Sequence, residues 1–320
     1  MVDAAADMLE VTIVGRTVEA DGIISLDLAA CDGHPLPTFE AGAHVDVHVA
    51  PGVVRQYSLC SDPAKSDAYR LAILLEAASR GGSSGIHGQF QLGQTMRIGA
   101  PRNAFRLVEE ADRSILMAGG IGVTPIYAMA HRLRALEADF AFHYCTRSGA
   151  RTAFRAELLQ ASFADRLTIH VDDEGTAIDL DATLAEPSAG THLYICGPGG
   201  FIDYVKATAE RLGWAKANVH VEHFGAEIDS VGESFTVEAR ISGMSLTIPG
   251  DQTIAQVLLA AGIDVPLSCE QGVCGTCLTR VIEGTPDHRD MFLSEDEHES
   301  GEEMAICCSR SKTPILVLDI

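Results

Sequence analysis

The sequence is short of basic residues and of long apolar runs. It has 23 Lys and Arg against 45 Asp and Glu, a formal net charge of -22, and so acidic a surface repels the phosphates of nucleic acids and anionic lipids. The uncharged stretch Ile115–Ala130 is too short for a bilayer span and is broken by three glycines and a proline. The first ten residues carry acids where a secretory signal carries bases. We expect a cytoplasmic protein with no nucleic-acid or membrane partner.

The length and composition indicate a globular protein of more than one domain. Its 320 residues suffice for about two domains at roughly 150 residues each. Apolar residues make up 47% and charged residues 21% of the chain, which is typical of a folded protein and not of a disordered one.

The nine cysteines are odd in number and unevenly spaced, which favours a metal site over a disulfide framework. Cys269, Cys274 and Cys277 form C-x4-C-x2-C, the spacing of plant-type [2Fe–2S] ferredoxins. Zinc is the weaker alternative, because no second C-x2-C or His pair follows. A fourth thiolate must come from elsewhere in the chain, and spacing alone does not choose between Cys307 and Cys308.

The segment around these cysteines has the pattern of a small β-grasp domain. Its expected strands and helix are Phe235–Ser242, Ser245–Ile248, Thr253–Ala261 (the helix, opened by a Thr N-cap), Leu278–Glu283 and Ile315–Ile320. An acidic run between 295 and 303 is expected to be a solvated helix face, with a docking surface as the alternative.

The middle of the chain, Ser114–Phe224, alternates apolar strands with helices, which predicts a parallel sheet. The expected helices are Pro125–Glu137, Thr152–Phe163, Asp179–Ala185 and Gly199–Leu212. Glycine-rich turns follow two of the strands, at Gly119–Pro125 and Cys196–Phe201. Neither turn has the G-x-G-x-x-G pattern, and either alone could be a plain connection. Two of them at the ligand-binding edge of one sheet favour a nucleotide site.

The first hundred residues show short alternating strands, in Val11–His48 and Val54–Ala77, which predict an antiparallel barrel. Within it, Arg55 and Tyr57 fall on the same face of one strand. Farther on, the glycine-rich loop Ser79–Gly88 carries an arginine and hydroxyls suited to a phosphate. Without other context the strand pair would be a surface feature and the loop a flexible connection.

Taken in order, these motifs resemble the phthalate dioxygenase reductase family of the ferredoxin–NADP reductase superfamily. The motifs are R-x-Y-S and GGS in the barrel, GGIGVTP and CGPGGF in the α/β part, and C-x4-C-x2-C with a late C-x-S-R. The resemblance implies a multidomain α/β and β protein. Its expected parts are an antiparallel FMN-binding β-barrel at 1–109, an α/β NAD-binding domain with a parallel sheet at 110–227, a linker at 228–234 and a β-grasp [2Fe–2S] ferredoxin domain at 235–320.

The resemblance also implies roles for individual residues. Those expected at the flavin and its phosphate are Arg55, Tyr57, Ser58, Arg80, Gly82, Ser83, Glu222 and Phe224. Those expected at the nucleotide are Gly120, Thr124, Pro125, Cys196, Gly197 and Phe201. Ser58, near the reactive flavin nitrogen, and Cys196, at the nicotinamide, are the candidate catalytic residues. The expected cluster ligands are Cys269, Cys274, Cys277 and Cys307, the last because it holds the C-x-S-R position.

By the same resemblance, the protein is a monomeric reductase component that passes electrons from NADH through FMN to a [2Fe–2S] cluster and on to a terminal Rieske-type oxygenase. FMN is favoured over FAD because no extra contacts for an adenine half are evident. NADPH stays open, since Thr146, Arg147 and Ser148 could bind a 2′-phosphate. One alternative is a stand-alone NADH-dependent reductase of a small acceptor such as a quinone, and another is an electron carrier without hydride chemistry.

Overall fold

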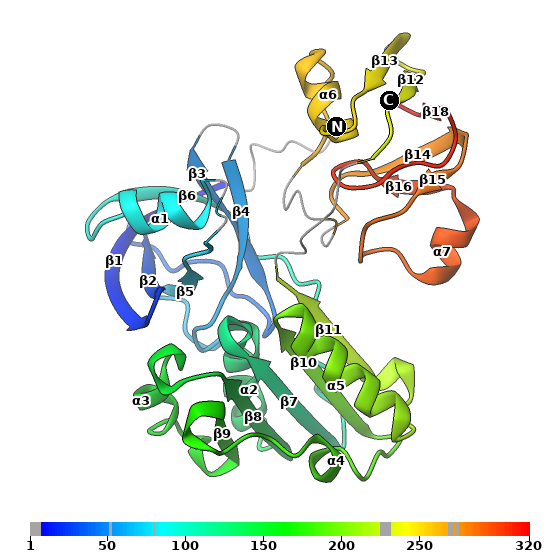
Figure 1. Cartoon of the computed structure of the whole chain (residues 1–320). Coiled ribbons are helices and arrows are strands. Elements are labelled where there is room, and N and C mark those ends of the chain that lie inside the picture. Colours follow the sequence, from blue (N-terminus) through cyan, green and yellow to red (C-terminus); the bar gives the residue numbers. More distant parts are fainter. Residues whose placement is uncertain are drawn as a thin grey trace. The chain divides into compact units, whose positions relative to one another are not determined.

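The computed structural model (Figure 1) describes residues 8–50, 53–77, 79, 81–224, 232–267, 272 and 275–320. The chain divides into two compact units, Met1–Phe224 and Gly225–Ile320. The boundary expected at 109/110 falls inside the first unit, and most of the expected linker lies outside the described residues. No helix in the described ranges is long and apolar enough to cross a membrane.

The first unit begins with a six-stranded antiparallel sheet, as the alternating pattern predicts. Its strands are β1 (Met8–Ala20), β2 (Ile23–Ala30), β3 (His44–Ala50), β4 (Val53–Ser58), β5 (Tyr69–Leu74) and β6 (Thr95–Gly99), in the order β4-β3-β6-β1-β2-β5. A bridge between Leu59 and Leu71 joins the two outer strands and closes the barrel. The predicted glycine-rich loop contains a short helix, α1 (Ser83–Gln89), which the scarce helix signals did not indicate.

The second sheet of this unit is parallel, which confirms the predicted α/β architecture. Its strands are β7 (Arg113–Gly119), β8 (Phe140–Thr146), β9 (Leu167–Val171), β10 (Thr191–Gly197) and β11 (Val219–His223), in the order β11-β10-β7-β8-β9. The strand order reverses between β7 and β10. In such sheets ligands bind at the carboxyl ends of the strands where the order reverses.

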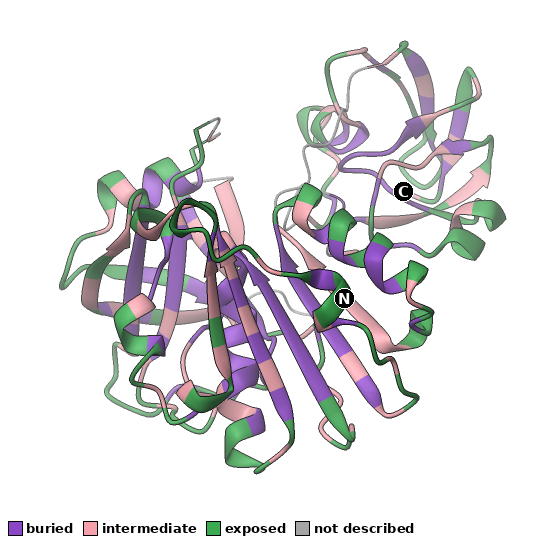
Figure 2. Ribbon diagram, turned by 60° about the horizontal axis from the view of Figure 1, so that its bottom comes forward, coloured by how far each residue is buried: buried purple, intermediate pink, exposed green. Residues whose placement is uncertain are grey.

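Helices cover both faces of the parallel sheet, so its central strands β7 and β10 are largely buried (Figure 2). On one face α2 (Val123–Ala135) packs into a core shared with the barrel. On the other, α4 (Leu180–Thr183) and α5 (Gly199–Arg211) bury the opposite side chains of β7 and β10. The short 3-10 turns are η1 (Gly120–Gly122), η2 (Gly149–Arg151), η3 (Ala164–Arg166), η4 (Asp172–Glu174) and η5 (Lys216–Asn218).

The helix expected at Thr152–Phe163 is only one turn long, α3 (Arg155–Leu158). Phe154, at its N-cap, has a left-handed backbone with φ 59°. An α-helix cannot pass through a residue in that conformation. The chain therefore uses turns here, and Phe154 is buried beside Tyr127.

The second unit is a mixed sheet with one helix on its buried face, as expected of a β-grasp fold. Its elements are β12 (Phe235–Ala239), β13 (Met244–Ile248), α6 (Ile254–Ala260), β14 (Leu278–Glu283), β15 (Pro286–Asp287), α7 (Glu295–Ser300), β16 (Glu303–Ala305), β17 (Arg310–Ser311) and β18 (Ile315–Leu318). The main sheet has the order β13-β12-β18-β14-β16, and β15 pairs with β17. The Thr253 hydroxyl caps α6 by accepting from the Gln256 backbone N–H, which confirms the predicted N-terminus.

Candidate cofactor sites

The first candidate site lies where the barrel meets the parallel sheet. Ser58 ends β4, and its Oγ donates to Oε2 of Glu222 in β11 at 3.3 Å. Burial raises the pKa of Glu222 to about 8, although the Ser58 hydrogen bond partly opposes the shift. Cys196 of β10 is aligned with Glu222 in the sheet, and burial, then the Glu222 charge, raises the pKa of its thiol. The structure thus brings together three of the residues expected at the reacting ends of flavin and nicotinamide.

Arg55 of β4 and the glycine loop before α1 also lie together. A Cβ at Gly82 would come 2.7 Å from Cγ of Arg55, so the loop backbone rests directly on the arginine stem. Ser83 is buried, and its Oγ accepts from the Glu76 N–H at 3.1 Å, leaving its proton for another acceptor. Arg80 lies outside the described residues. A backbone cradle beside an arginine fits a phosphate group.

Tyr57 lies in β4, next to Ser58, and Phe224 directly follows β11. Both are partly buried and pack against the core that the barrel shares with α2. Burial raises the pKa of Tyr57 to about 12, so its hydroxyl is neutral and can donate.

The two glycine-rich turns form a second candidate site at the carboxyl ends of β7 and β10. A Cβ at Gly119 would lie 2.7 Å from the Phe201 ring, and one at Gly197 would lie 2.8 Å from the same ring. A Cβ at Gly122 would lie 2.3 Å from the carbonyl oxygen of Cys196. The turns therefore pack backbone to backbone, with one aromatic ring between them. Only glycine permits this approach, which suits a flat dinucleotide lying on both turns.

The remaining predicted nucleotide residues differ in exposure. Gly120 is partly exposed and has a left-handed φ of 54°. Thr124 and Pro125 are buried in the first turn of α2, and the Thr124 hydroxyl donates to the carbonyl of Ile121 at 3.1 Å. Thr124 and Pro125 therefore support the turn on its buried side, and Gly120 lies on its solvent-facing side.

Two of the four predicted cluster cysteines are described. Cys277 and Cys307 are both buried, and the backbone N–H of Ile306 donates to the carbonyl of Cys277 at 3.4 Å, which holds their segments together. Cys269 and Cys274 lie outside the described residues. Buried soft ligands from two segments suit an iron–sulfur cluster.

The neighbouring Cys308 has a different environment. Its buried thiol donates to the carbonyl of Ala305 at 3.5 Å. Gly272 of the cysteine loop packs against Cys308, where a Cβ would meet its sulfur at 2.7 Å, and has a left-handed φ of 68°. These contacts suit Cys308 as a packing residue under the loop.

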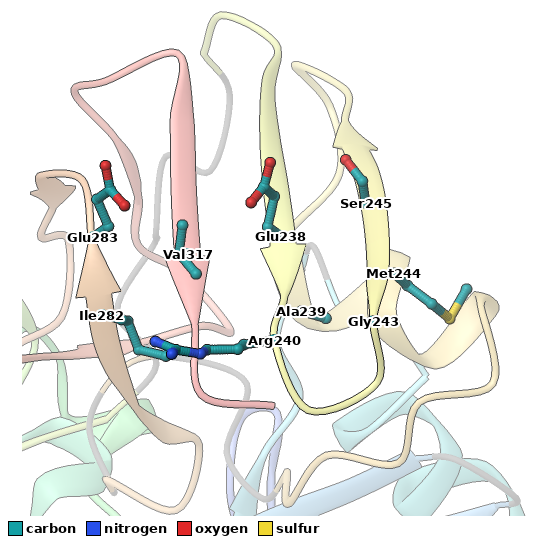
Figure 3. Close-up of a pocket in the computed structure, with 9 residues that line it drawn as sticks. All are labelled: Glu238, Ala239, Arg240, Gly243, Met244, Ser245, Ile282, Glu283 and Val317. Atoms are coloured by element: carbon teal, nitrogen blue, oxygen red, sulfur yellow. The ribbon is translucent and has the colours of Figure 1, made fainter.

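A pocket of about 390 Å³ lies on the exposed face of the second unit's sheet, between β12, β13, β14 and β18 (Figure 3). It is lined by Glu238, Ala239, Arg240, Gly243, Met244, Ser245, Ile282, Glu283 and Val317. None of these is a predicted cofactor residue, so the pocket is not part of either site.

Sequence patterns missed one side-chain cluster. His288, Asp290 and His298 offer ligand atoms that all lie within 4.8 Å of one another. Their spacing along the chain matches no common metal motif, and only the fold of β15 and α7 brings them together.

These two sites and the fold define a class of protein: a flavin- and nucleotide-binding reductase joined to a plant-type ferredoxin. The chain matches the family model described as "2Fe-2S iron-sulfur cluster binding domain" over residues 238–312. It also matches "Dimethylamine monooxygenase subunit DmmA-like, N-terminal domain" over residues 96–219.

Similarity to individual proteins extends over nearly the whole chain. It is 49% identical to the vanillate O-demethylase oxidoreductase of Pseudomonas putida, over 98% of this chain and 100% of the relative. It is 42% identical to the tetrachlorobenzoquinone reductase of Sphingobium chlorophenolicum, over 98% of each. The solved structure of phthalate dioxygenase reductase, "a modular structure for electron transfer from pyridine nucleotides to [2Fe–2S]", superposes with a TM-score of 0.80 at 38% identity, covering 98% of both chains.

The chain therefore belongs to the phthalate dioxygenase reductase family. It is an oxidoreductase that carries electrons from a pyridine nucleotide through a flavin to a [2Fe–2S] cluster. This confirms the predicted family, fold class and reductase function.

Proposed function

We propose that this protein is the NADH-dependent, FMN-containing reductase of a terminal Rieske-type oxygenase that O-demethylates a methoxylated aromatic acid. The observation that carries the proposal is the full-length similarity to vanillate O-demethylase oxidoreductase. The convergence of Ser58, Cys196 and Glu222 at one sheet edge supports it.

In the proposed mechanism, FMN when bound supplies the exchange between a two-electron donor and a one-electron acceptor. The Ser58 hydroxyl lies at the reactive edge of the flavin. Glu222 accepts the hydrogen bond that this hydroxyl donates and thereby orients it. Cys196 stays a neutral thiol because burial raises its pKa, so it shapes the nicotinamide slot without attacking it.

The other predicted residues bind the flavin and the dinucleotide. We propose that Arg55, the Gly82 backbone, Ser83 and Arg80 hold the FMN phosphate, since the first two are in contact. Tyr57 and Phe224 flank the ring system from the shared core. Gly120 and Gly197 receive the dinucleotide, and Thr124, Pro125 and Phe201 support the two turns.

NADH is favoured over NADPH by the charges around the end of β8. Three acids, Asp172, Asp173 and Glu174, follow β9 directly. The Asp173 N–H donates to the carbonyl of Arg147 at 3.2 Å, so these acids lie beside the segment that is the candidate for a 2′-phosphate. Glu174 is paired with Arg155 at 2.6 Å, so Asp172 and Asp173 are the acids that would oppose a phosphate. A 2′-phosphate would meet like charge there, whereas carboxylates can accept from ribose hydroxyls.

The cluster ligands we propose are Cys269, Cys274, Cys277 and Cys307, with Cys308 as a packing residue. We propose domain boundaries at 109/110 and 227/228, with a linker at 228–234 before the ferredoxin domain. A monomer in the cytoplasm stays a prediction from the sequence.

An anaerobic titration tests the proposal. We expect NADH to bleach the flavin and iron–sulfur bands at far lower concentration than NADPH. Adding a vanillate demethylase oxygenase component, vanillate and oxygen should then consume vanillate in step with NADH. A reductase that is reduced by NADH but never supports vanillate turnover would overturn the aromatic substrate and leave the electron-transfer chain intact.

A second candidate function is direct reduction of a quinone. The 42% identity to tetrachlorobenzoquinone reductase favours it. To distinguish the oxygenase reductase from the quinone reductase, the oxygenase is replaced by a halogenated quinone and NADH oxidation is followed. NADH oxidation as fast with quinone as with the oxygenase would support the second candidate.

A further inference from the structure

Three side chains with metal-ligand chemistry meet beside α7 in the second unit, and one of them, Asp290, packs against Gly272 of the cysteine loop. His288 and Asp290 follow β15, and His298 lies in the last turn of α7. Nδ1 of His288 is 3.6 Å from Oδ1 of Asp290, and Nε2 of His298 is 3.2 Å from Oδ2. Ligand atoms around a tetrahedral Zn²⁺ with bonds of about 2.1 Å lie about 3.4 Å apart. The two separations, each to a different Asp290 oxygen, lie on either side of that value, and a metal ion would replace the hydrogen bond between His298 and Asp290.

The ring nitrogens of His288 are buried without a hydrogen bond among the described residues. The side chain is 7% exposed. The 3.6 Å separation from Asp290 is too long for a hydrogen bond. An unsatisfied buried polar group costs about 1–3 kcal/mol.

Asp290 is already held in place by its surroundings. Its side chain is fully buried, Oδ2 accepts from the Leu293 N–H at 2.9 Å, and Oδ1 accepts from the Ser309 hydroxyl at 3.3 Å. Outer contacts of this kind orient a carboxylate ligand toward an ion. The buried carboxylate therefore presents its oxygens to the two histidines without rearrangement.

His298 supplies the third ligand and the opening to solvent. The Ser294–Glu297 capping box fixes the start of α7, and the His298 N–H donates to the Ser294 carbonyl at 2.9 Å. The His298 ring stacks on His288 with centroids 4.3 Å apart and 20° between planes, and the ligand nitrogens of the two rings lie within 4.8 Å of each other. The His298 side chain is 28% exposed, which leaves an entry path and a place for water.

We propose that His288, Asp290 and His298 bind one divalent transition-metal ion of the Zn²⁺ type, with water at the fourth position. Two imidazoles and one carboxylate suit Zn²⁺ and its neighbours in the first transition row better than Mg²⁺ or Ca²⁺. The ion would fasten α7 to the segment that follows β15. The site is distinct from the iron–sulfur cysteines, since it contains no sulfur.

The test uses the full-length holoprotein with its flavin and cluster. After equilibrium dialysis against micromolar Zn²⁺, zinc per chain is measured for the wild type, for His298→Ala and for Asp290→Asn. His34→Ala removes an exposed histidine of the first unit and serves as the matched control. We expect one Zn²⁺ per chain in the wild type and the control, and at least about 10-fold weaker binding in the two site variants. Iron content and the visible spectrum are measured for each variant, and zinc is compared only at equal cluster content, because Asp290 packs against Gly272 of the cysteine loop.

X-ray absorption at the zinc edge decides where the ion sits. Nitrogen and oxygen neighbours near 2.0–2.1 Å with no sulfur shell support the site. A sulfur shell near 2.3 Å would place zinc on cysteines and overturn the proposal. Equal zinc binding by His298→Ala, Asp290→Asn and the wild type would overturn it as well. Slower hydrogen exchange across α7 on adding Zn²⁺, in the wild type alone, is the expected structural signature.

Discussion

The hydroxyl of Ser58 donates to the carboxylate of Glu222 at 3.3 Å, across 164 residues of sequence. The bond joins the last residue of a barrel strand to an edge strand of the parallel sheet. It fixes the two parts at the place where a flavin held by the barrel would face a nucleotide held by the sheet. Both residues should therefore affect stability and electron transfer in ways that can be separated.

Ionisation of Glu222 should destabilise the fold. Burial raises its pKa from 4.5 to about 8, so the folded chain keeps a proton that the unfolded chain loses. The stability that this group contributes is full below pH 4.5 and is lost as the pH rises through about 8. Because Glu222 is only partly buried, water screens its charge, and we expect a loss on the order of 1 kcal/mol. Urea unfolding between pH 5 and pH 9 measures it.

Glu222→Gln should flatten that part of the stability curve, because an amide does not titrate. Glu186→Gln, which changes an exposed acid of the same α/β part, should leave the slope as it is. An unchanged slope in Glu222→Gln would show that another group titrates.

Removing the Ser58 hydroxyl should slow flavin reduction. Ser58→Ala deletes the donor to Glu222 and, in the proposed site, the hydroxyl at the flavin edge. A hydrogen bond between neutral groups contributes about 0.5–1.5 kcal/mol, so we expect NADH-driven bleaching to slow by about 2- to 10-fold. Anaerobic stopped-flow absorbance measures the rate. Ser66→Ala, elsewhere in the barrel, should react like the wild type. A wild-type rate in Ser58→Ala with full flavin content would exclude Ser58 from the reaction.

Local signals sufficed for much of the fold and for the motifs. The Thr253 cap, the alternation of β3 and the apolar strands of the parallel sheet are each encoded by adjacent residues. The contacts between distant segments were not predictable. Nothing in the pattern around Phe154 signals a left-handed residue, and nothing in the spacing of His288 and His298 signals that α7 brings them together. Such features depend on tertiary packing, which overrides local propensity.

The contact between the two glycine turns predicts an asymmetric response to added methyl groups. A Cβ at Gly122 would lie 2.3 Å from the Cys196 carbonyl oxygen, which is backbone and cannot rotate away. Gly122→Ala should therefore cost about 1–3 kcal/mol and raise the KM for NADH, because the turns must separate. Gly199→Ala, at the start of α5, meets no protein atom within 4 Å and should leave the stability unchanged. Urea midpoints and steady-state kinetics compare the two. Equal stability of both variants would contradict the packing.

The cysteine pair at 307 and 308 gives a matched test of the cluster. Both thiols are buried and adjacent, so replacing either by serine perturbs the same core. In Cys308→Ser the new hydroxyl can still donate to the Ala305 carbonyl, as the thiol does at 3.5 Å. We therefore expect this variant to keep its cluster.

Cys307→Ser and Cys277→Ser should each lose most of their iron and acid-labile sulfide, because serine is a poor ligand for iron that prefers thiolate. Flavin binding and its reduction by NADH should survive in both, since those sites belong to the first unit. Metal analysis and the visible spectrum record the outcome. Loss of the cluster in Cys308→Ser, together with its retention in Cys307→Ser, would reverse the assignment and make Cys308 the fourth ligand.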